Sequence, residues 1–328
     1  MTRVGIIANP AAGKDIRRLV AHASVFDNNE KVNIVRRVLL GLDATGIEEV
    51  VFMPDYYAIG ARALENLDLS LHPLFLDMST EFNQTDSTLA AQLMLEMGVG
   101  CIVTLGGDGT NRAVAKGCGS VPLMPISTGT NNVFPQMIEG TIAGLAAGVV
   151  VSGIVPAIQV LQSNPRLEIL RDGEVCDIAL VDAVVYDDPF VGSRAIWDES
   201  KIQQLVLAKA EPYNVGLSSI GGNLNLCMPN PGQGLALEMG GNGLRVLSPI
   251  SPGLIRWVNI SSYNTLNEGE SVAVNCTPGI IGLDGERELT LSVGENVRIR
   301  LSNSGPKVID VQAALREAAN VGFFCKSR

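Results

Sequence analysis

The sequence predicts an N-terminal Rossmann-like parallel α/β domain, an antiparallel β-sandwich-like domain, and a C-terminal helix that packs back on the first domain. Strand and helix patterns alternate over the first half, which is typical of a parallel sheet with helices on both faces. From about residue 154, short strand patterns separated by Gly-, Asn- and Pro-containing turns favour antiparallel sheet. We therefore expect domains over residues 1–150 and 151–305, with residues 306–328 returning to the first domain.

The elements of the first domain are expected from hydrophobic periodicity. Strands are predicted over residues 4–8, 49–53, 72–77, 101–105 and 121–126. Helices are predicted over residues 15–23, 30–42, 56–66, 85–97, 110–117 and 139–150. Either Thr85 or Asp86 is expected to cap the helix that starts near them, because both side chains accept hydrogen bonds from helix N–H groups.

The β-rich part is expected to consist of short strands. They are predicted over residues 155–162, 166–171, 174–186, 203–209, 233–239, 243–248, 254–260, 270–276, 287–292 and 296–302. The last expected element is a helix over residues 311–319.

Composition excludes several classes of partner. A net charge of −10 argues against nucleic acid and against an anionic membrane surface, because both bind basic faces. The six cysteines form no CxxC pair and only two histidines occur, so no zinc site is expected, and no residue is assigned as a metal ligand. Reduced, buried thiols fit a cytoplasmic protein.

One uncharged stretch, between Glu139 and Arg166, is long enough to cross a bilayer. Glycines, Pro156 and polar side chains interrupt it, and no basic residue flanks its start. We therefore expect a buried helix there and no membrane span.

The most informative stretch is CIVTLGGDGT, residues 101–110. A buried-type strand runs into Gly106, Gly107, Asp108, Gly109 and Thr110. Glycines allow a sharp turn and a close approach of backbone N–H groups to a ligand, and the helix that follows favours phosphate at its N-terminus. A carboxylate at that place can accept a proton from a hydroxyl or hold Mg²⁺ on a nucleotide. The plain alternative is a tight turn with an N-capping aspartate.

Two further loops follow predicted strands of the same sheet. NPAAGK contributes Asn9, Gly13 and Lys14, although it is not a Walker A loop and a plain turn is the alternative. STGTNN contributes the candidates Thr128, Gly129, Thr130, Asn131 and Asn132, for which an Asx-turn is the alternative.

The second half adds a few polar candidates. Asp182 lies in the run ALVDAVV, and the acids at 187 and 188 just beyond it are expected to be surface turn residues. GLSSIGG, residues 216–222, is a loop of small residues that permits close approach. LDGE, with Asp284 and Glu286, has the pattern of a hairpin turn.

In this order, these stretches resemble the superfamily of NAD kinases and bacterial diacylglycerol and sphingosine-type lipid kinases, in which GGDGT is the hallmark motif. ALVDAVV is similar to the NAD kinase pattern Ala-Leu-Asn-Glu-Val-Val, with Val181 at the Asn position. NPAAGK and GTNN look more like lipid kinase motifs, yet Ala113 stands where those enzymes carry Glu. The group that the chain resembles most is called ATP-NAD kinase-like or acetoin catabolism protein X.

The resemblance implies a cytoplasmic, ATP- and Mg²⁺-dependent kinase that phosphorylates a hydroxyl group, foremost the 2′-OH of NAD⁺ to give NADP⁺. Asp108 would be the catalytic base, and the loop residues named above, with Asp182, would bind ATP and the acceptor. Asp284 and Glu286 match the lipid kinase Asp-Gly-Glu motif and are secondary candidates. Self-association as a homodimer or tetramer is also implied.

Two alternatives remain open from the sequence. One is a kinase of another acceptor, either a lipid or a small metabolite, although the acidic charge disfavours a membrane approach. The other is a nucleotide-binding protein without turnover that is linked to acetoin catabolism. A nicotinamide dehydrogenase is disfavoured because GGDGT lacks the G-x-G-x-x-G spacing.

Overall fold

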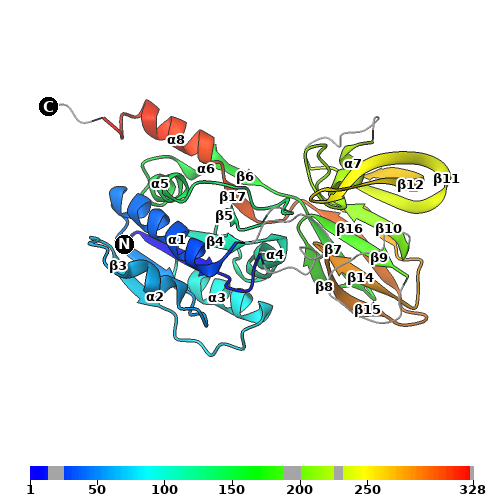
Figure 1. Cartoon of the computed structure of the whole chain (residues 1–328), viewed down its shortest axis with the longest axis horizontal. Coiled ribbons are helices and arrows are strands. Elements are labelled where there is room, and N and C mark those ends of the chain that lie inside the picture. The colour runs from blue at the N-terminus through cyan, green and yellow to red at the C-terminus, as the bar shows by residue number, and fades with distance from the viewer. Residues whose placement is uncertain (14–25, 130, 188–200, 225–231, 326–328) are drawn as a thin grey trace.

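The computed structural model describes residues 1–13, 26–129, 131–187, 201–224 and 232–325. An α/β part holds the N-terminus and a β-rich part follows it, while the C-terminal helix α8 (Val311–Asn320) lies against the α/β part (Figure 1). The predicted fold class is therefore confirmed. The expected helix over residues 15–23 lies outside the described residues.

One seven-stranded sheet organises the α/β part. Its order is β3 (His72–Phe75), β2 (Glu49–Phe52), β1 (Arg3–Ala8), β4 (Cys101–Gly106), β5 (Leu123–Ser127), β17 (Lys307–Ile309) and β6 (Leu161–Ser163). The first five pair in parallel, and β1 lies between β2 and β4. The strand order reverses beside β1, so the carboxyl ends of β1 and β4 form the switch point at which such sheets bind ligands.

Helices cover both faces of this sheet. On one face, a core cluster unites the sheet with α1 (Asn28–Ala44), α2 (Ile59–Leu64), α5 (Gly140–Val151) and α8. On the other, a second cluster unites it with α3 (Gln84–Glu96) and α4 (Asp108–Gly117). Because helices bury both faces of the sheet, its strands are mostly apolar.

Helices α1 and α5 lie unusually close, which explains the glycines of the uncharged stretch. A Cβ atom built on Gly144 would lie 2.3 Å from the carbonyl oxygen of Val38, and one on Gly41 would lie 2.6 Å from that of Thr141. Only glycine permits this approach. Within the described residues, no helix is both long and apolar enough to span a bilayer.

Two antiparallel sheets form the β-rich part. Its strands are β7 (Arg166–Arg171), β8 (Glu174–Ala179), β9 (Asp182–Tyr186), β10 (Ile202–Leu207), β11 (Gly234–Ser251), β12 (Leu254–Leu266), β13 (Ser271–Ala273), β14 (Gly279–Leu283), β15 (Glu286–Leu291) and β16 (Val297–Ser302). The sheet orders are β12-β11-β10-β9-β14-β15 and β13-β16-β7-β8. Apolar side chains of both sheets share one core, as in a sandwich. The short helix α7 (Ser218–Gly222) covers the outer face of the larger sheet.

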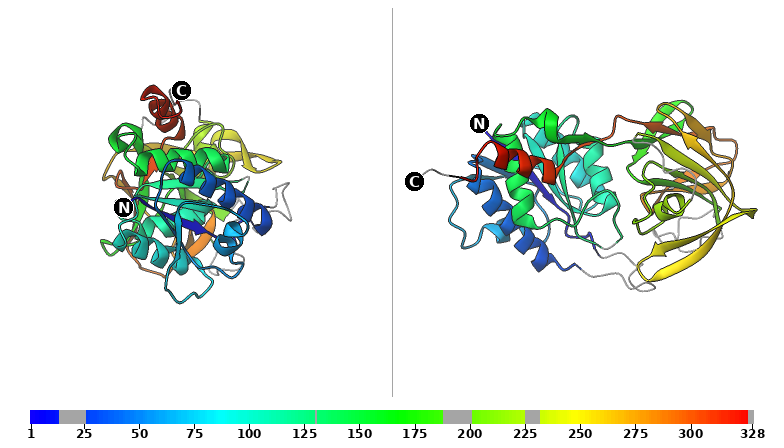
Figure 2. Two further views of the ribbon diagram at one scale, coloured as in Figure 1. Left: turned by 90° about the vertical axis from the view of Figure 1, so that its left-hand side faces the viewer. Right: turned by 90° about the horizontal axis from the view of Figure 1, so that it is seen from above.

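The chain crosses between the two parts twice, once after β6 and once before β17 (Figure 2). These crossings touch, because Asn164 donates from Nδ2 to the carbonyl oxygen of Pro306 at 3.3 Å. The α/β part is therefore completed by β17 and α8, which follow the whole β-rich part in the sequence.

Several expected elements differ in detail. The strand expected over residues 155–162 is the short helix α6 (Ala157–Val160) followed by β6, which belongs to the seven-stranded sheet. The strand expected over 174–186 is divided into β8 and β9, whereas the two expected over 233–248 form the single strand β11. Asn83, rather than Thr85 or Asp86, caps α3, because its side chain accepts from the backbone N–H of Thr85.

Candidate active site

Three loops meet at the carboxyl ends of β1, β4 and β5. Asn9 donates from Nδ2 to Thr110 Oγ1 at 2.9 Å, which joins the first loop to α4. A Cβ on Gly107 would lie 2.7 Å from Asn132 Oδ1, and one on Gly13 would lie 2.8 Å from the carbonyl oxygen of Thr128. The structure therefore brings most of the predicted loop residues together, and the glycines are needed because the loops touch.

A buried lysine holds the first loop. Lys31 of α1 has no exposed surface, and its Nζ donates to the carbonyl oxygens of Asn9 at 2.9 Å and Ala12 at 2.7 Å. These bonds fix the loop after β1 against α1. The sequence analysis missed this residue, which in a helix pattern looks like an ordinary surface lysine.

Asp108 is the first residue of α4 and is only 8% exposed. Its Oδ1 accepts from the backbone N–H of Phe134 at 2.7 Å and of Val133 at 3.1 Å, and its Oδ2 accepts from Val133 at 3.1 Å. The carboxylate thus fixes the loop after β5 relative to α4. Each carboxylate oxygen has two acceptor positions, so Oδ2 retains one.

The surroundings of Asp108 disfavour its charge. Burial and, second, the neighbouring Asp284 raise its pKa to about 7, while the Phe134 and Val133 N–H groups and Lys209 act in the opposite direction. A carboxyl group with a pKa near neutrality can both accept and release a proton at physiological pH, as acid–base catalysis requires.

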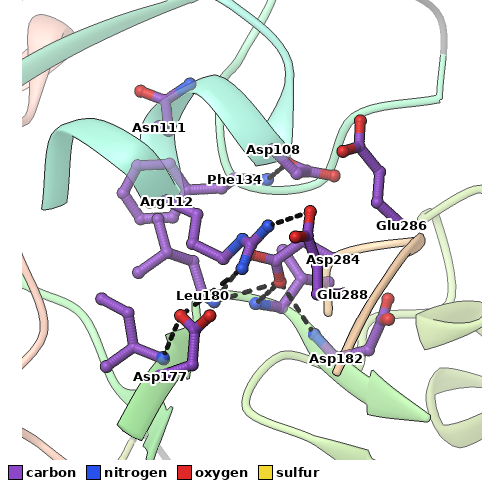
Figure 3. Close-up of polar contacts among 12 residues, drawn as sticks. Asp108, Asn111, Arg112, Phe134, Asp177, Leu180, Asp182, Asp284, Glu286 and Glu288 are labelled. Carbon is purple, nitrogen blue, oxygen red and sulfur yellow. Dashed lines mark hydrogen bonds and ion pairs between the residues drawn. The ribbon is translucent and has the colours of Figure 1, made fainter. Parts of the chain in front are cut away.

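The predicted LDGE turn is a two-residue hairpin between β14 and β15. Asp284 and Gly285 have φ angles of +52° and +80°, which is the type I′ geometry that Asp-Gly favours. Asp284 Oδ1 accepts from the backbone N–H groups of Leu180 at 3.0 Å, Val181 at 2.8 Å and Asp182 at 3.2 Å (Figure 3). Asp284 therefore holds the turn between β8 and β9. Burial raises its pKa, although Arg112 opposes the shift.

Arg112 of α4 joins the two parts of the molecule. Its guanidinium is 1% exposed and forms ion pairs with Glu288 at 2.7 Å, Asp177 at 3.5 Å and Asp284 at 3.8 Å (Figure 3). Burial acts to lower its pKa, but Asp284 and the other carboxylates outweigh it, so the pKa is raised. This network ties α4 to three places in the β-rich part. The sequence does not reveal this network because the carboxylates lie 65 or more residues away from Arg112.

Glu286, directly after the hairpin turn, faces the start of α4. Its Oε2 accepts from Gln84 Nε2 at 2.8 Å, and its Oε1 lies 3.5 Å from the position of a Cβ on Gly109. Asp182, at the start of β9, is 6% exposed and is joined to Asp284 through its backbone. Figure 3 shows Asp108, Asp182 and Glu286 around the same site.

Lys209, just beyond β10, is a further residue that the sequence analysis missed. Its Nζ lies 4.6 Å from the centre of the Phe134 ring. Burial lowers its pKa to about 8, while Asp108 and Asp284 act to raise it. A cation from the β-rich part therefore lies beside the loop that holds Asp108.

The remaining candidates are placed as follows. Lys14, Thr130 and the acid at 188 lie outside the described residues. The small-residue stretch 216–222, expected to be a loop, is mostly the helix α7, and Asn131 lies beside its start, because a Cβ on Gly216 would be 3.4 Å from Asn131 Oδ1. Asp187 is exposed at the end of β9. Among the described residues, no group of three His, Cys, Asp or Glu side chains is arranged to hold a metal ion.

Comparisons with known proteins identify the class. Residues 4–153 match the family described as ATP-NAD kinase N-terminal domain, and residues 165–304 match the one described as Acetoin catabolism protein X C-terminal domain. With the fold described above, the first match defines a protein of kinase-type fold.

A full-length relative narrows the class to one family. Acetoin catabolism protein X of Cupriavidus necator is 40% identical over 329 residues, which cover 96% of this chain and 92% of that protein. The chain therefore belongs to the acetoin catabolism protein X family. A putative diacylglycerol kinase from Bacillus anthracis is also similar, with 15% identity, a TM-score of 0.44 and coverage of 94% of this chain and 97% of that one.

Proposed function

We propose that the protein is an ATP-dependent kinase that transfers a phosphoryl group to a hydroxyl group, with the 2′-OH of NAD⁺ as the first acceptor to test. The observation that carries this proposal is the position of Asp108, at the N-terminus of α4, where the loops after β1, β4 and β5 meet and Glu286 approaches from the β-rich part. Phosphoryl transfer depends mainly on positioning and charge stabilisation, which such a site can supply.

The loops are proposed to bind the phosphates of ATP. Backbone N–H groups at a helix N-terminus attract anions, and residues without a Cβ let the phosphates come close. The proposed binding residues are Asn9, Gly13, Lys14, Gly106, Gly107, Gly109, Thr110, Thr128, Gly129, Thr130, Asn131 and Asn132.

Asp108 is the proposed general base. In the transfer, the acceptor O–H bond breaks and its proton passes to Asp108, while the acceptor oxygen bonds to the γ-phosphorus. The bond from that phosphorus to the β,γ-bridging oxygen breaks, and its electron pair stays on ADP. A pKa of about 7 leaves Asp108 ionised above neutral pH and gives it more basicity than an exposed aspartate has.

Mg²⁺ is proposed to enter as part of the MgATP substrate. Protein sites commonly hold Mg²⁺ through one or two carboxylates together with phosphate oxygens, so no cage built by the protein alone is required. Asp182 and Glu286 carry hard oxygen donors that fit this role. Asp284 is engaged by three backbone N–H groups and by Arg112, and we propose that it positions the β8–β9 turn.

One observation favours an acceptor other than NAD⁺. Val181, at the position of the NAD kinase asparagine, is buried in the apolar core, and its N–H group is bonded to Asp284. It therefore offers no polar side chain to a dinucleotide. A small hydroxylated metabolite is the alternative acceptor that follows.

We also propose that the protein acts in the cytoplasm, where ATP and NAD⁺ are found, and that it self-associates through β12. This strand forms the edge of the larger sheet, and its Ile255 and Trp257 side chains are exposed. An edge of this kind can pair with a second copy of the chain. Light scattering coupled to size-exclusion chromatography tests this point.

The experiment that tests the proposed activity uses ATP labelled at the γ-phosphorus and a panel of NAD⁺, small hydroxylated metabolites and diacylglycerol. Label in NADP⁺ supports the first acceptor, and label in another compound supports the second class. ATP binding without label in any acceptor contradicts a kinase and supports a nucleotide-binding protein without turnover. A matched Asp108→Asn sample controls for contaminating kinases.

A further inference from the structure

Among the described residues, Lys209 has no hydrogen-bond or ion-pair partner, in contrast to Arg112 and Lys116. Its ammonium group has no hydrogen bond and no ion pair to any part of the chain that the structure describes, and it lies over the face of the Phe134 ring, 4.6 Å from the ring centre. By contrast, Lys116 is paired with Asp177 at 2.6 Å and Arg112 with three carboxylates. An ammonium carries three N–H donors, and no described residue accepts a hydrogen bond from those of the partly buried Lys209.

The location of Lys209 connects it to the chemistry. It lies two residues beyond β10, in the β-rich part, yet it packs on Phe134 of the α/β part. The backbone N–H of that same Phe134 donates to Asp108 Oδ1 at 2.7 Å. The ammonium interacts electrostatically with Asp108, Asp284 and Glu211 but forms an ion pair with none of them. A group bound between the ammonium and Asp108 would therefore touch both.

The charge balance of the site gives this cation a role. Asp108, Asp182, Asp284 and Glu286 all come from elements that meet here, and an excess of carboxylates repels phosphate. The ammonium of Lys209 offsets part of this charge, and with a pKa of about 8 it is mostly protonated at pH 7. A compact ammonium suits a single phosphoryl oxygen as a point charge.

We propose that Lys209 is a phosphate-binding catalytic residue, whose ammonium donates a hydrogen bond to a non-bridging oxygen of the phosphoryl group that is transferred beside Asp108. This inference rests on the proposed kinase function and extends it to a residue of the β-rich part. Lys209 remains protonated throughout, so it supplies charge and orientation rather than a proton. The site would then be complete only when both parts of the molecule are in place.

The test compares the wild type with Lys209→Met and Lys209→Arg, using inorganic tripolyphosphate as the probe in calorimetry and labelled ATP for turnover. We expect the Met variant to bind tripolyphosphate at least about tenfold more weakly and to lose about 10²-fold or more in kcat, the scale of a lost charge-stabilising donor. The Arg variant, which keeps the charge, should bind within about fivefold of the wild type. Lys307→Met removes an exposed lysine from β17 and is the control for a general change in charge.

The outcomes separate this inference from the proposed function. If the wild type binds neither tripolyphosphate nor ATP, the kinase proposal fails. If the wild type binds both, and the Met variant binds and turns over equally well, only the role of Lys209 is refuted. Should the Met variant lose its near-UV circular dichroism, the Arg variant decides: binding close to that of the wild type supports the inference, and binding lost by about tenfold or more contradicts it.

Discussion

Asp108→Asn should make the protein more stable at high pH, because the wild type holds a buried carboxylate there. The pKa of Asp108 rises from 3.8 to about 7 on folding, owing first to burial and then to Asp284. Between these values the unfolded chain has lost the proton and the folded protein keeps it, so the free energy of unfolding falls as the pH rises. The contribution of this raised pKa to the free energy of unfolding is fully present below about pH 4 and is lost once the pH has passed about 7.

The magnitude follows from the shift. A difference of about 3 pKa units, at about 1.4 kcal/mol each, gives about 4 kcal/mol over the full range, and about 2 to 3 kcal/mol of it falls between pH 5 and pH 8. Asparagine does not ionise, so the stability of the variant relative to the wild type should rise by that amount between the two pH values. The asparagine side-chain amide also faces the backbone N–H of Val133. This lowers the free energy of unfolding of the variant by the same amount at every pH.

Urea unfolding followed by circular dichroism at pH 5 and pH 8 measures the effect. Thr128→Val, which changes a buried hydroxyl in the neighbouring loop and adds no titratable group, is the control and should shift stability equally at both pH values. A difference between Asp108→Asn and the wild type that stays constant, or that shrinks as the pH rises, would refute the reasoning.

Three further substitutions test other parts of the structure. Arg112→Met should lower the free energy of unfolding by about 3 to 5 kcal/mol, because it removes the cation beside the buried Asp284 and breaks the ion pair with Glu288, whereas Lys116→Met removes a more exposed pair and should cost at most about 1 kcal/mol. Gly144→Ala should cost about 1 to 3 kcal/mol in urea unfolding, because its Cβ would lie 2.3 Å from the Val38 carbonyl oxygen. Glu286→Gln should reduce phosphoryl transfer by about 10²-fold, measured as ADP formation, because it removes a carboxylate proposed to bind the Mg²⁺ of MgATP beside α4.

Each of these has a contradicting result. Equal losses for Arg112→Met and Lys116→Met would mean that the buried network contributes no more than a surface pair. A Gly144→Ala protein as stable as the wild type would show that α1 and α5 can separate without cost. An unchanged turnover in Glu286→Gln would limit that carboxylate to holding Gln84.

The fold class was predictable because it depends on local patterns. The spacing of apolar residues and the composition both change near residue 154. The apolar run before GGDGT can be recognised as a buried strand without knowledge of its neighbours in the sheet. The division between β8 and β9 was not predictable, because the pattern of residues 174–186 is that of a single strand without Gly, Pro or Asn to mark a turn. The turn within them is held by Asp284, about a hundred residues away, and no local pattern contains that bond.

The candidate site, like the fold, was predictable where it depends on local sequence patterns. The glycine and asparagine loops follow strands, so their meeting at one edge of the sheet follows from parallel topology. Arg112, Lys31 and Lys209 were missed, since a charged residue in a helix or after a strand normally faces water. Lys31 is buried by the loop after β1, and Arg112 and Lys209 make contacts across the two parts of the molecule, which only the assembled structure contains.

The measurement that tests the account most directly is the transfer of label from γ-labelled ATP to an acceptor, in the wild type and in Asp108→Asn at pH 8. The account predicts labelled product in the wild type and a loss of at least about 10²-fold in the variant, with the variant folded and still able to bind ATP. Equal transfer by the two proteins would contradict it.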